Sequence, residues 1–201
     1  MALLVTLAGL FVGGASRRMG GFPKGLLPTR DAPSIFHRTT HLLETLGLPW
    51  VGVGSHHAYE NHQRFLSDEP PDIGPLGGLC PLLRAAAVVI CGGSANASPH
   101  TLQPKTTVLA IACDMPFLTE AIVRRLVESP CASVLAPRRQ GRWEPLFALY
   151  DVSTVLPVAL ARAQSRQLSL QGLLDAVGAA EFPLCDGELD LLHDWDKPED
   201  L

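Results

Sequence analysis

The chain has 201 residues, of which 47% are hydrophobic, and its formal net charge is −4 at pH 7. This length and apolar content can bury one sizeable core, so we expect a single domain over residues 1–201. The lack of a basic excess argues against a general nucleic-acid-binding protein. No apolar run reaches the length that spans a bilayer, and the N-terminus lacks a signal-peptide pattern, so a cytoplasmic protein is expected.

Apolar runs alternate with helical patterns along the chain. In chain order they predict a strand at 3–12, a helix at 35–46, a strand at 50–53, a helix at 76–89, a strand at 107–113, a helix at 119–129, strands at 133–137 and 146–150, helices at 152–163 and 170–177, and a strand at 189–193. Ser34 and Thr119 are expected N-caps, and Pro81 indicates that its helix starts near Cys80 or is kinked. The alternation predicts an α/β fold with a mostly parallel, buried central sheet.

Cysteine and histidine spacing gives no sign of a metal centre. The chain has five cysteines without C-x-x-C spacing: Cys80, Cys91, Cys113, Cys131 and Cys185. An odd number of unpaired cysteines indicates reduced thiols, and we expect each to be a small buried side chain. His56, His57 and His62 look like a metal cluster, but they lie in a polar segment without paired ligand spacing, so we expect surface histidines rather than metal ligands.

A glycine-rich segment with fixed positive charge follows the first predicted strand. Residues 12–21 read Val-Gly-Gly-Ala-Ser-Arg-Arg-Met-Gly-Gly, and Lys24 lies close behind. Glycines let backbone N–H groups converge on an anion, and Arg17, Arg18 and Lys24 add the charge that a polyphosphate needs. A Walker P-loop is excluded because Gly25, not Ser or Thr, follows the lysine. The pattern favours a nucleotide site over the alternative, a glycine turn with solvated arginines.

Asp114 directly follows the buried strand at 107–113. Ligands of α/β sheets bind at the carboxyl ends of strands. Mg²⁺ typically takes one or two protein carboxylates and leaves its other positions to water and phosphate, so a lone carboxylate here favours Mg²⁺ binding. The alternative is that Asp114 caps the following helix, but Thr119 is better placed for that role.

A basic run at Arg138, Arg139 and Arg142 precedes Trp143. Its arginines either lie in a solvated loop or hold an anionic phosphate of a second substrate, and the sequence does not separate these alternatives. Trp143 is expected at the edge of the core rather than stacked on a ligand.

Several of these segments resemble the molybdenum cofactor guanylyltransferases. Residues 11–27 look like the family loop L-A-G-G-x-S-x-R-M-G-x-x-K, and Asp68 with Gly-Pro-Leu-Gly-Gly-Leu at 74–79 is similar to its acidic residue and G-P-L-x-G segment. Cys-Asp-Met-Pro-Phe-Leu at 113–118 resembles its metal motif. Residues 144–150 and 196–201 match two later landmarks, so the resemblance extends over essentially the whole chain.

The resemblance implies a three-layer, Rossmann-like nucleotidyltransferase fold and an Mg²⁺-dependent enzyme. Its reaction would transfer GMP from GTP to molybdenum-molybdopterin and release pyrophosphate, with molybdenum cofactor maturation proteins as partners. The implied nucleotide-binding residues are Phe11, Val12, Gly13, Gly14, Arg18, Lys24, Asp68, Gly78 and Asp114. Of these, Arg18, Lys24 and Asp114 are the implied catalytic residues, and Asp114 is the implied metal ligand.

Some positions depart from the family pattern. Phe11 and Val12 replace Leu-Ala, and Pro23 replaces an acidic residue. The segment at 51–55, which includes Gly54, lacks an asparagine, and Asp194 and Asp196 stand where asparagines are frequent. These departures leave open a relative that transfers CMP to molybdopterin or a nucleotide to a sugar phosphate. They also leave open a non-catalytic nucleotide-binding protein of molybdoenzyme maturation.

Overall fold

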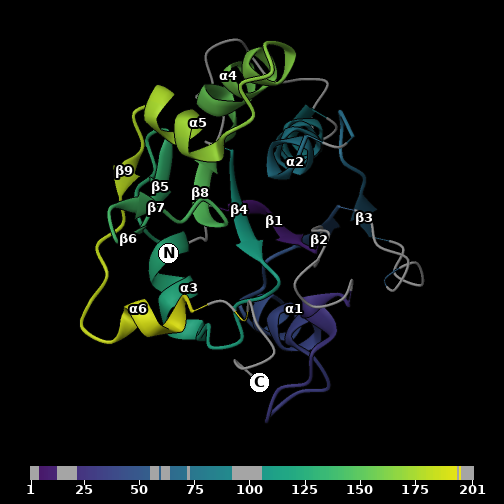
Figure 1. Cartoon of the computed structure of the whole chain (residues 1–201), viewed down its shortest axis with the longest axis vertical. Coiled ribbons are helices and arrows are strands. Elements are labelled where there is room, and N and C mark those ends of the chain that lie inside the picture. The colour runs from purple at the N-terminus through teal and green to yellow at the C-terminus, as the bar shows by residue number, and fades with distance from the viewer. Residues whose placement is uncertain are drawn as a thin grey trace.

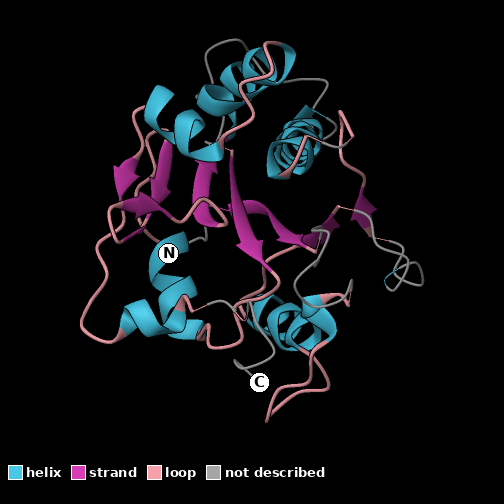
Figure 2. Cartoon of the chain, viewed as in Figure 1, coloured by secondary structure: helices cyan, strands magenta, loops and turns pink. Residues whose placement is uncertain are grey.

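The computed structural model describes residues 5–12, 22–54, 59, 64–71, 73–91, 106–193 and 195. Within them, a seven-stranded sheet lies between two layers of helices (Figure 1, Figure 2). The strand order is β3 (Phe65–Leu66), β2 (Trp50–Val53), β1 (Val5–Phe11), β4 (Thr107–Ala112), β8 (Phe147–Asp151), β5 (Val134–Ala136) and β9 (Ala180–Glu181). β8 runs antiparallel to β4 and β5, and the other neighbouring pairs are parallel. The expected α/β fold with a mostly parallel central sheet is confirmed.

The helices form the two outer layers of the three-layer arrangement. Figure 1 shows α1 (Ile35–Thr45), α3 (Glu120–Val127) and α6 (Glu188–Leu191) on one face of the sheet, and α2 (Pro75–Cys91), α4 (Val152–Gln164) and α5 (Leu170–Ala176) on the other. Shorter elements are the 3-10 helix η2 (Lys24–Leu26) and the hairpin of β6 (Arg138–Arg139) and β7 (Arg142–Trp143). Among the described residues, no helix combines the length and the hydropathy needed to cross a membrane.

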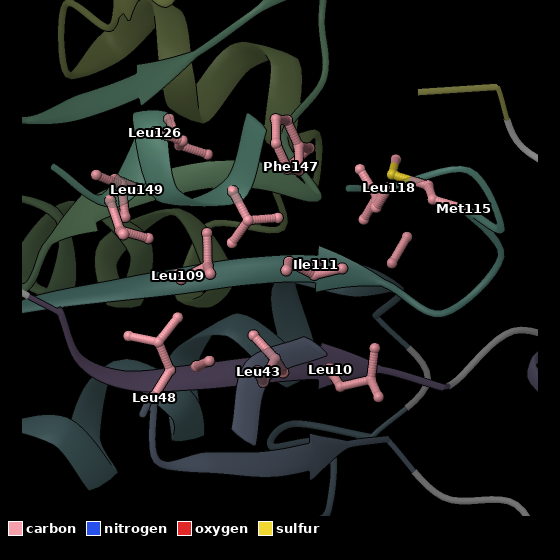
Figure 3. Close-up of a cluster of buried hydrophobic side chains, with 14 of the residues drawn as sticks. Leu10, Leu43, Leu48, Leu109, Ile111, Met115, Leu118, Leu126, Phe147 and Leu149 are labelled. Atoms are coloured by element: carbon pink, nitrogen blue, oxygen red, sulfur yellow. The ribbon is translucent and has the colours of Figure 1, made fainter. Parts of the chain in front are cut away.

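The central strand β4 is buried on both faces. Its successive side chains point to opposite sides of the sheet. Leu109 and Ile111 therefore join the cluster covered by α1 and α3, whereas Val108 and Ala110 join the cluster covered by α2 and α4. Figure 3 shows the first cluster, in which side chains from α1, α3 and β8 surround those of β1 and β4. Burial on both faces explains why the sequence of this strand is apolar from Val108 to Ala112.

The predicted helix starts are confirmed in part. Ser34 caps α1, because its hydroxyl accepts a hydrogen bond from the His37 N–H at 3.2 Å. Thr119 occupies the N-cap position of α3, but its side chain makes no capping hydrogen bond. At α4 the buried Asp151 accepts from the Thr154 N–H at 2.9 Å, a cap that the sequence analysis did not predict.

The predicted helix at 76–89 is confirmed as α2, and of the two alternatives for Pro81 the start near Cys80 is wrong, because α2 starts at Pro75 and contains Pro81. Proline has no N–H, so Pro81 cannot donate to the carbonyl of Gly77 four residues earlier. That carbonyl instead accepts a hydrogen bond from the Glu69 N–H at 2.8 Å. Because Pro81 leaves the Gly77 carbonyl unused within the helix, this carbonyl can bond the segment that follows β3 to α2.

The predicted strand at 189–193 is also wrong, because residues Glu188–Leu191 form the helix α6. Charged and apolar residues alternate over these four positions, which imitates the period of a strand. The last strand is instead β9, which has only two residues and carries no readable pattern. The same shortness explains why β3, β6 and β7 were not predicted.

The cysteine prediction is confirmed for three residues and wrong for one. Cys80, Cys113 and Cys131 are buried free thiols, whereas the free thiol of Cys185 is exposed. Cys185 lies in the connection between β9 and α6, outside both apolar clusters.

We expect Gly9→Ala to destabilise the protein by about 1–3 kcal/mol, because it overpacks the contact between β1 and α2. A Cβ at Gly9 would overlap Leu82 and approach Val53 Cγ2 at 3.1 Å, and both side chains are fully buried. Urea unfolding measures the change. In a Leu82→Ala background the same substitution should cost less than half as much, since the cavity accepts the added methyl group. An equal cost in both backgrounds would contradict this explanation.

Candidate active site

The carboxyl ends of β1 and β4 lie next to each other. The two strands are parallel with Phe11 opposite Ala112, and the Cys113 N–H donates to the Phe11 carbonyl at 3.0 Å. The glycine-rich segment that follows β1 and the Asp114 segment that follows β4 therefore leave the sheet at the same edge. Gly13, Gly14, Arg17 and Arg18 lie outside the described residues.

Phe11 and Val12 are built into the sheet edge. The Val12 N–H donates to the Val53 carbonyl at 3.0 Å. A backbone N–H donates a single hydrogen bond, so the Val12 N–H is not available to a nucleotide. A backbone contact from Val12 to a nucleotide would therefore be made by its carbonyl. Both side chains are buried.

Lys24 and Asp114 are brought together although they lie 90 positions apart in sequence. Lys24 Nζ lies 3.4 Å from Asp114 Oδ2, and the two side chains are 17% and 22% exposed. The lysine starts η2, and the aspartate follows β4 after one residue. Partial exposure leaves both charged groups accessible to a ligand at the sheet edge.

Gly25 permits this approach. A Cβ at Gly25 would lie 2.5 Å from the Tyr59 hydroxyl and 3.0 Å from Cys113 Sγ. A larger residue would therefore push η2 away from the end of β4. The glycine that excluded a P-loop is thus the residue that lets Lys24 reach Asp114.

Cys113 supports the site as a neutral group. Burial and the adjacent Asp114 carboxylate raise the pKa of its thiol to about 12, against the opposing effects of the Gly25 backbone and Lys24. The thiolate is the nucleophilic form of cysteine, and this residue does not populate it near neutral pH.

Asp68 and Gly78 meet near the Phe11 ring. A Cβ at Gly78 would lie 3.2 Å from Asp68 Oδ1, 3.1 Å from Phe11 Cε1 and 2.5 Å from Val53 Cγ1. Only glycine leaves room for the three groups to converge here. The backbone next to Asp68 is anchored to α2, because the Glu69 N–H donates to the Gly77 carbonyl.

The Asp114 segment has a further support that the sequence analysis missed. The Trp195 N–H donates to the Asp114 carbonyl at 3.0 Å. The Trp195 ring also meets the exposed Phe117 ring edge to face, with centroids 6.0 Å apart. No sequence pattern links positions this far apart, although Trp195 borders the last motif quoted above.

The donor groups fit a cation shared with a ligand. Within the described ranges, no group of three His, Cys, Asp or Glu side chains is placed to hold a metal ion. Mg²⁺ needs no such cage, because water and substrate phosphates fill most of its coordination sphere. Asp114 supplies a partly exposed carboxylate of the type that Mg²⁺ accepts.

The basic run forms the β6–β7 hairpin. The Trp143 ring is buried, with its Nε1–H donating to Asp175 Oδ1 at 2.8 Å and the Arg138 guanidinium 3.7 Å from the ring centroid. The expectation that Trp143 lies at the edge of the core is confirmed. Arg139 pairs with Glu144 at 2.7 Å, and Arg142 is exposed.

The fold is an α/β sheet with a partly exposed lysine and aspartate at its carboxyl edge, which is where ligands of such sheets bind. Residues 8–179 match the family model of the MobA-like NTP transferase domain. The chain belongs to this family and is a nucleotidyltransferase, as the family resemblance of its motifs predicted.

Named relatives agree with this membership, and a solved structure shares the fold. "Probable molybdenum cofactor guanylyltransferase" of Chloroflexus aggregans is 30% identical over 166 residues, which cover 79% of this chain and 72% of the relative. Molybdenum cofactor guanylyltransferase of Pseudomonas putida is 27% identical, with 96% and 93% covered. The 2-C-methyl-D-erythritol 4-phosphate cytidylyltransferase of Thermus thermophilus shares the fold, with a TM-score of 0.58, 14% identity, and 96% and 93% covered.

We expect iodoacetamide at pH 8 to alkylate Cys185 in the folded protein and to spare Cys113. Alkylation needs the thiolate, and a pKa of about 12 keeps Cys113 protonated until the pH rises far above 8. Peptide mapping before and after unfolding in urea reads each cysteine separately. Modification of Cys113 in the folded protein at a rate equal to that of Cys185 would show that its thiol is neither buried nor neutral.

Proposed function

We propose that the chain is a molybdenum cofactor guanylyltransferase, which transfers GMP from GTP to molybdenum-molybdopterin and releases pyrophosphate. We also propose that residues 1–201 form one domain. The observation that carries the proposal is the 3.4 Å pair of Lys24 and Asp114 at the shared edge of β1 and β4, in a chain of this family. The names of the matched relatives support the choice of GTP and molybdopterin.

In the proposed reaction, an oxygen of the molybdopterin phosphate attacks the α-phosphorus of GTP. A new P–O bond forms, the bond between the α-phosphorus and its bridging oxygen breaks, and pyrophosphate carries away the electron pair. A phosphate nucleophile is already ionised near neutral pH, so no general base is required. The protein instead contributes alignment and charge neutralisation.

Each proposed site residue has a role within that reaction. Arg18 and Lys24 would hold the triphosphate, while Gly13, Gly14 and the carbonyls of Phe11 and Val12 would contact the nucleoside. Asp68 would bind the nucleoside from the side of α2, where Gly78 leaves space for it. Asp114 would hold Mg²⁺, which supplies positive charge to the phosphates when it is bound.

Pyrophosphate release tests the proposed function directly. We expect release with GTP and molybdopterin together, and little with CTP or UTP in place of GTP. Faster turnover with CTP would identify a cytidylyltransferase. GTP binding without pyrophosphate release would identify a non-catalytic maturation protein.

Asp114→Asn should lower the rate of pyrophosphate release at least about 100-fold, because the amide keeps the shape of the carboxylate but not its charge. The fold should persist, since Trp195 bonds to the backbone carbonyl of this residue rather than to its side chain. Asp186→Asn, at an exposed loop position, is the matched control. Wild-type activity in the Asp114 variant would remove this carboxylate from the mechanism.

Lys24→Ala should weaken GTP binding about 10- to 100-fold, the loss expected for a hydrogen bond to a charged group. Guanosine binding should change less than twofold, because the ammonium is assigned to the phosphates. Isothermal titration with the two ligands measures both values. Equal losses for both ligands would show that Lys24 acts through the position of η2.

A further inference from the structure

A polar pocket lies beside the β6–β7 hairpin, outside the residues assigned to the nucleotide. Its volume is about 770 Å³, and it is lined by Arg139, Gln140, Arg142, Trp143, Glu144, Pro145 and Gln171. The lining carries two guanidinium groups and one carboxylate, which leaves one excess positive charge. Such a lining suits a small anion.

The hairpin is held in place by hydrogen bonds to α5 and by contacts between its own residues. The side-chain amide of Gln171 bonds to both backbone groups of Trp143, accepting from its N–H at 3.0 Å and donating to its carbonyl at 2.8 Å. Arg138 stacks on the Trp143 ring and donates to the Gly141 carbonyl at 2.9 Å. Two of the three arginines are therefore committed to neighbours, since Arg139 pairs with Glu144.

Arg142 differs from Arg138 and Arg139. Its side chain is exposed, and among the described residues no ion pair or hydrogen bond engages its guanidinium. It stands directly after the tight turn at Gln140 and Gly141, whose φ angles are 51° and 77°. A guanidinium that is free on a fixed hairpin is prepared to bind an oxyanion with two parallel hydrogen bonds.

The sheet places this pocket at the same edge as Asp114. The hairpin leaves β5 at its carboxyl end and leads into β8 through Glu144, Pro145 and Leu146. The Leu146 carbonyl accepts from the Ala112 N–H at 2.8 Å, two residues before Asp114. The segment that leads from the hairpin into β8 is therefore bonded to the end of β4, and the pocket and the Lys24–Asp114 pair lie at the same edge of the sheet.

We propose that the hairpin pocket is the subsite for the acceptor, with Arg142 binding its phosphate monoester. This inference rests on the proposed function, in which that phosphate attacks the α-phosphorus of GTP. Arg142 would orient the attacking phosphate from one side while Lys24 and Asp114 organise the triphosphate from the other. The phosphate monoester of the acceptor would then be both the anion that the pocket binds and the nucleophile of the reaction.

Arg142→Gln tests the assignment, with Arg124→Gln as a matched exposed arginine on α3 and Arg142→Lys as the conservative variant. The measurements are the KM for molybdopterin during turnover, its Kd by titration, and the Kd for GTP. We expect Arg142→Gln to raise both molybdopterin constants about 10- to 100-fold, as for loss of a charged hydrogen-bonding partner. GTP affinity should stay within twofold, and Arg142→Lys should recover part of the loss.

Molybdopterin from which the phosphate has been removed provides a second binding measurement. It should bind the wild type and Arg142→Gln equally, because the group that Arg142 recognises is missing. Equal molybdopterin affinity in the wild type and Arg142→Gln would overturn the subsite, as would an equal loss of GTP affinity. If the wild type binds molybdopterin but releases no pyrophosphate, the proposed reaction fails while the comparison of Kd values still tests Arg142.

Discussion

The parallel pairing of β1 with β4 is the constraint on which the site depends. It sets Phe11 opposite Ala112, and the hydrogen bond from Cys113 to Phe11 extends the pairing beyond the strand ends. The two chemically distinct segments of the sequence, one rich in glycine and cations and one carrying a carboxylate, must therefore leave the sheet together. A shift of this register would separate Lys24 from Asp114 even if every loop kept its conformation.

Two glycines then bring side chains into contact above that edge. Gly25 lets η2 approach Cys113, which carries Lys24 to Asp114, and Gly78 lets Asp68 approach Phe11. In both cases neighbouring side chains fill the space that a Cβ would otherwise occupy. These two glycines thus act through packing, because they set how closely the neighbouring side chains approach.

Much of the fold was predictable because its central elements carry strong patterns. β1, β2 and β4 are uncharged and almost entirely apolar, and α1 has both a capping serine and a terminating glycine. Two-residue strands carry no period, and the alternating residues of α6 imitate a strand, so these elements were missed or misassigned.

The site was predictable only to the level of its segments. The rule that ligands bind at strand ends singled out the segments that carry Lys24 and Asp114, and the structure brings these two side chains together. The engagement of the Val12 N–H in the sheet and the support of Asp114 by Trp195 depend on tertiary contacts that no local pattern records. The hairpin shows the same limit, because only the structure separates the committed Arg138 from the exposed Arg142.

The most direct test is a crystal structure of the protein with GTP and Mg²⁺ bound. Lys24 Nζ should contact the triphosphate, and an Asp114 carboxylate oxygen should coordinate the ion at about 2.1 Å. Nucleotide bound elsewhere, for example in the pocket between α1 and the start of β2 that includes His37 and Trp50, would contradict the shared site at the β1–β4 edge.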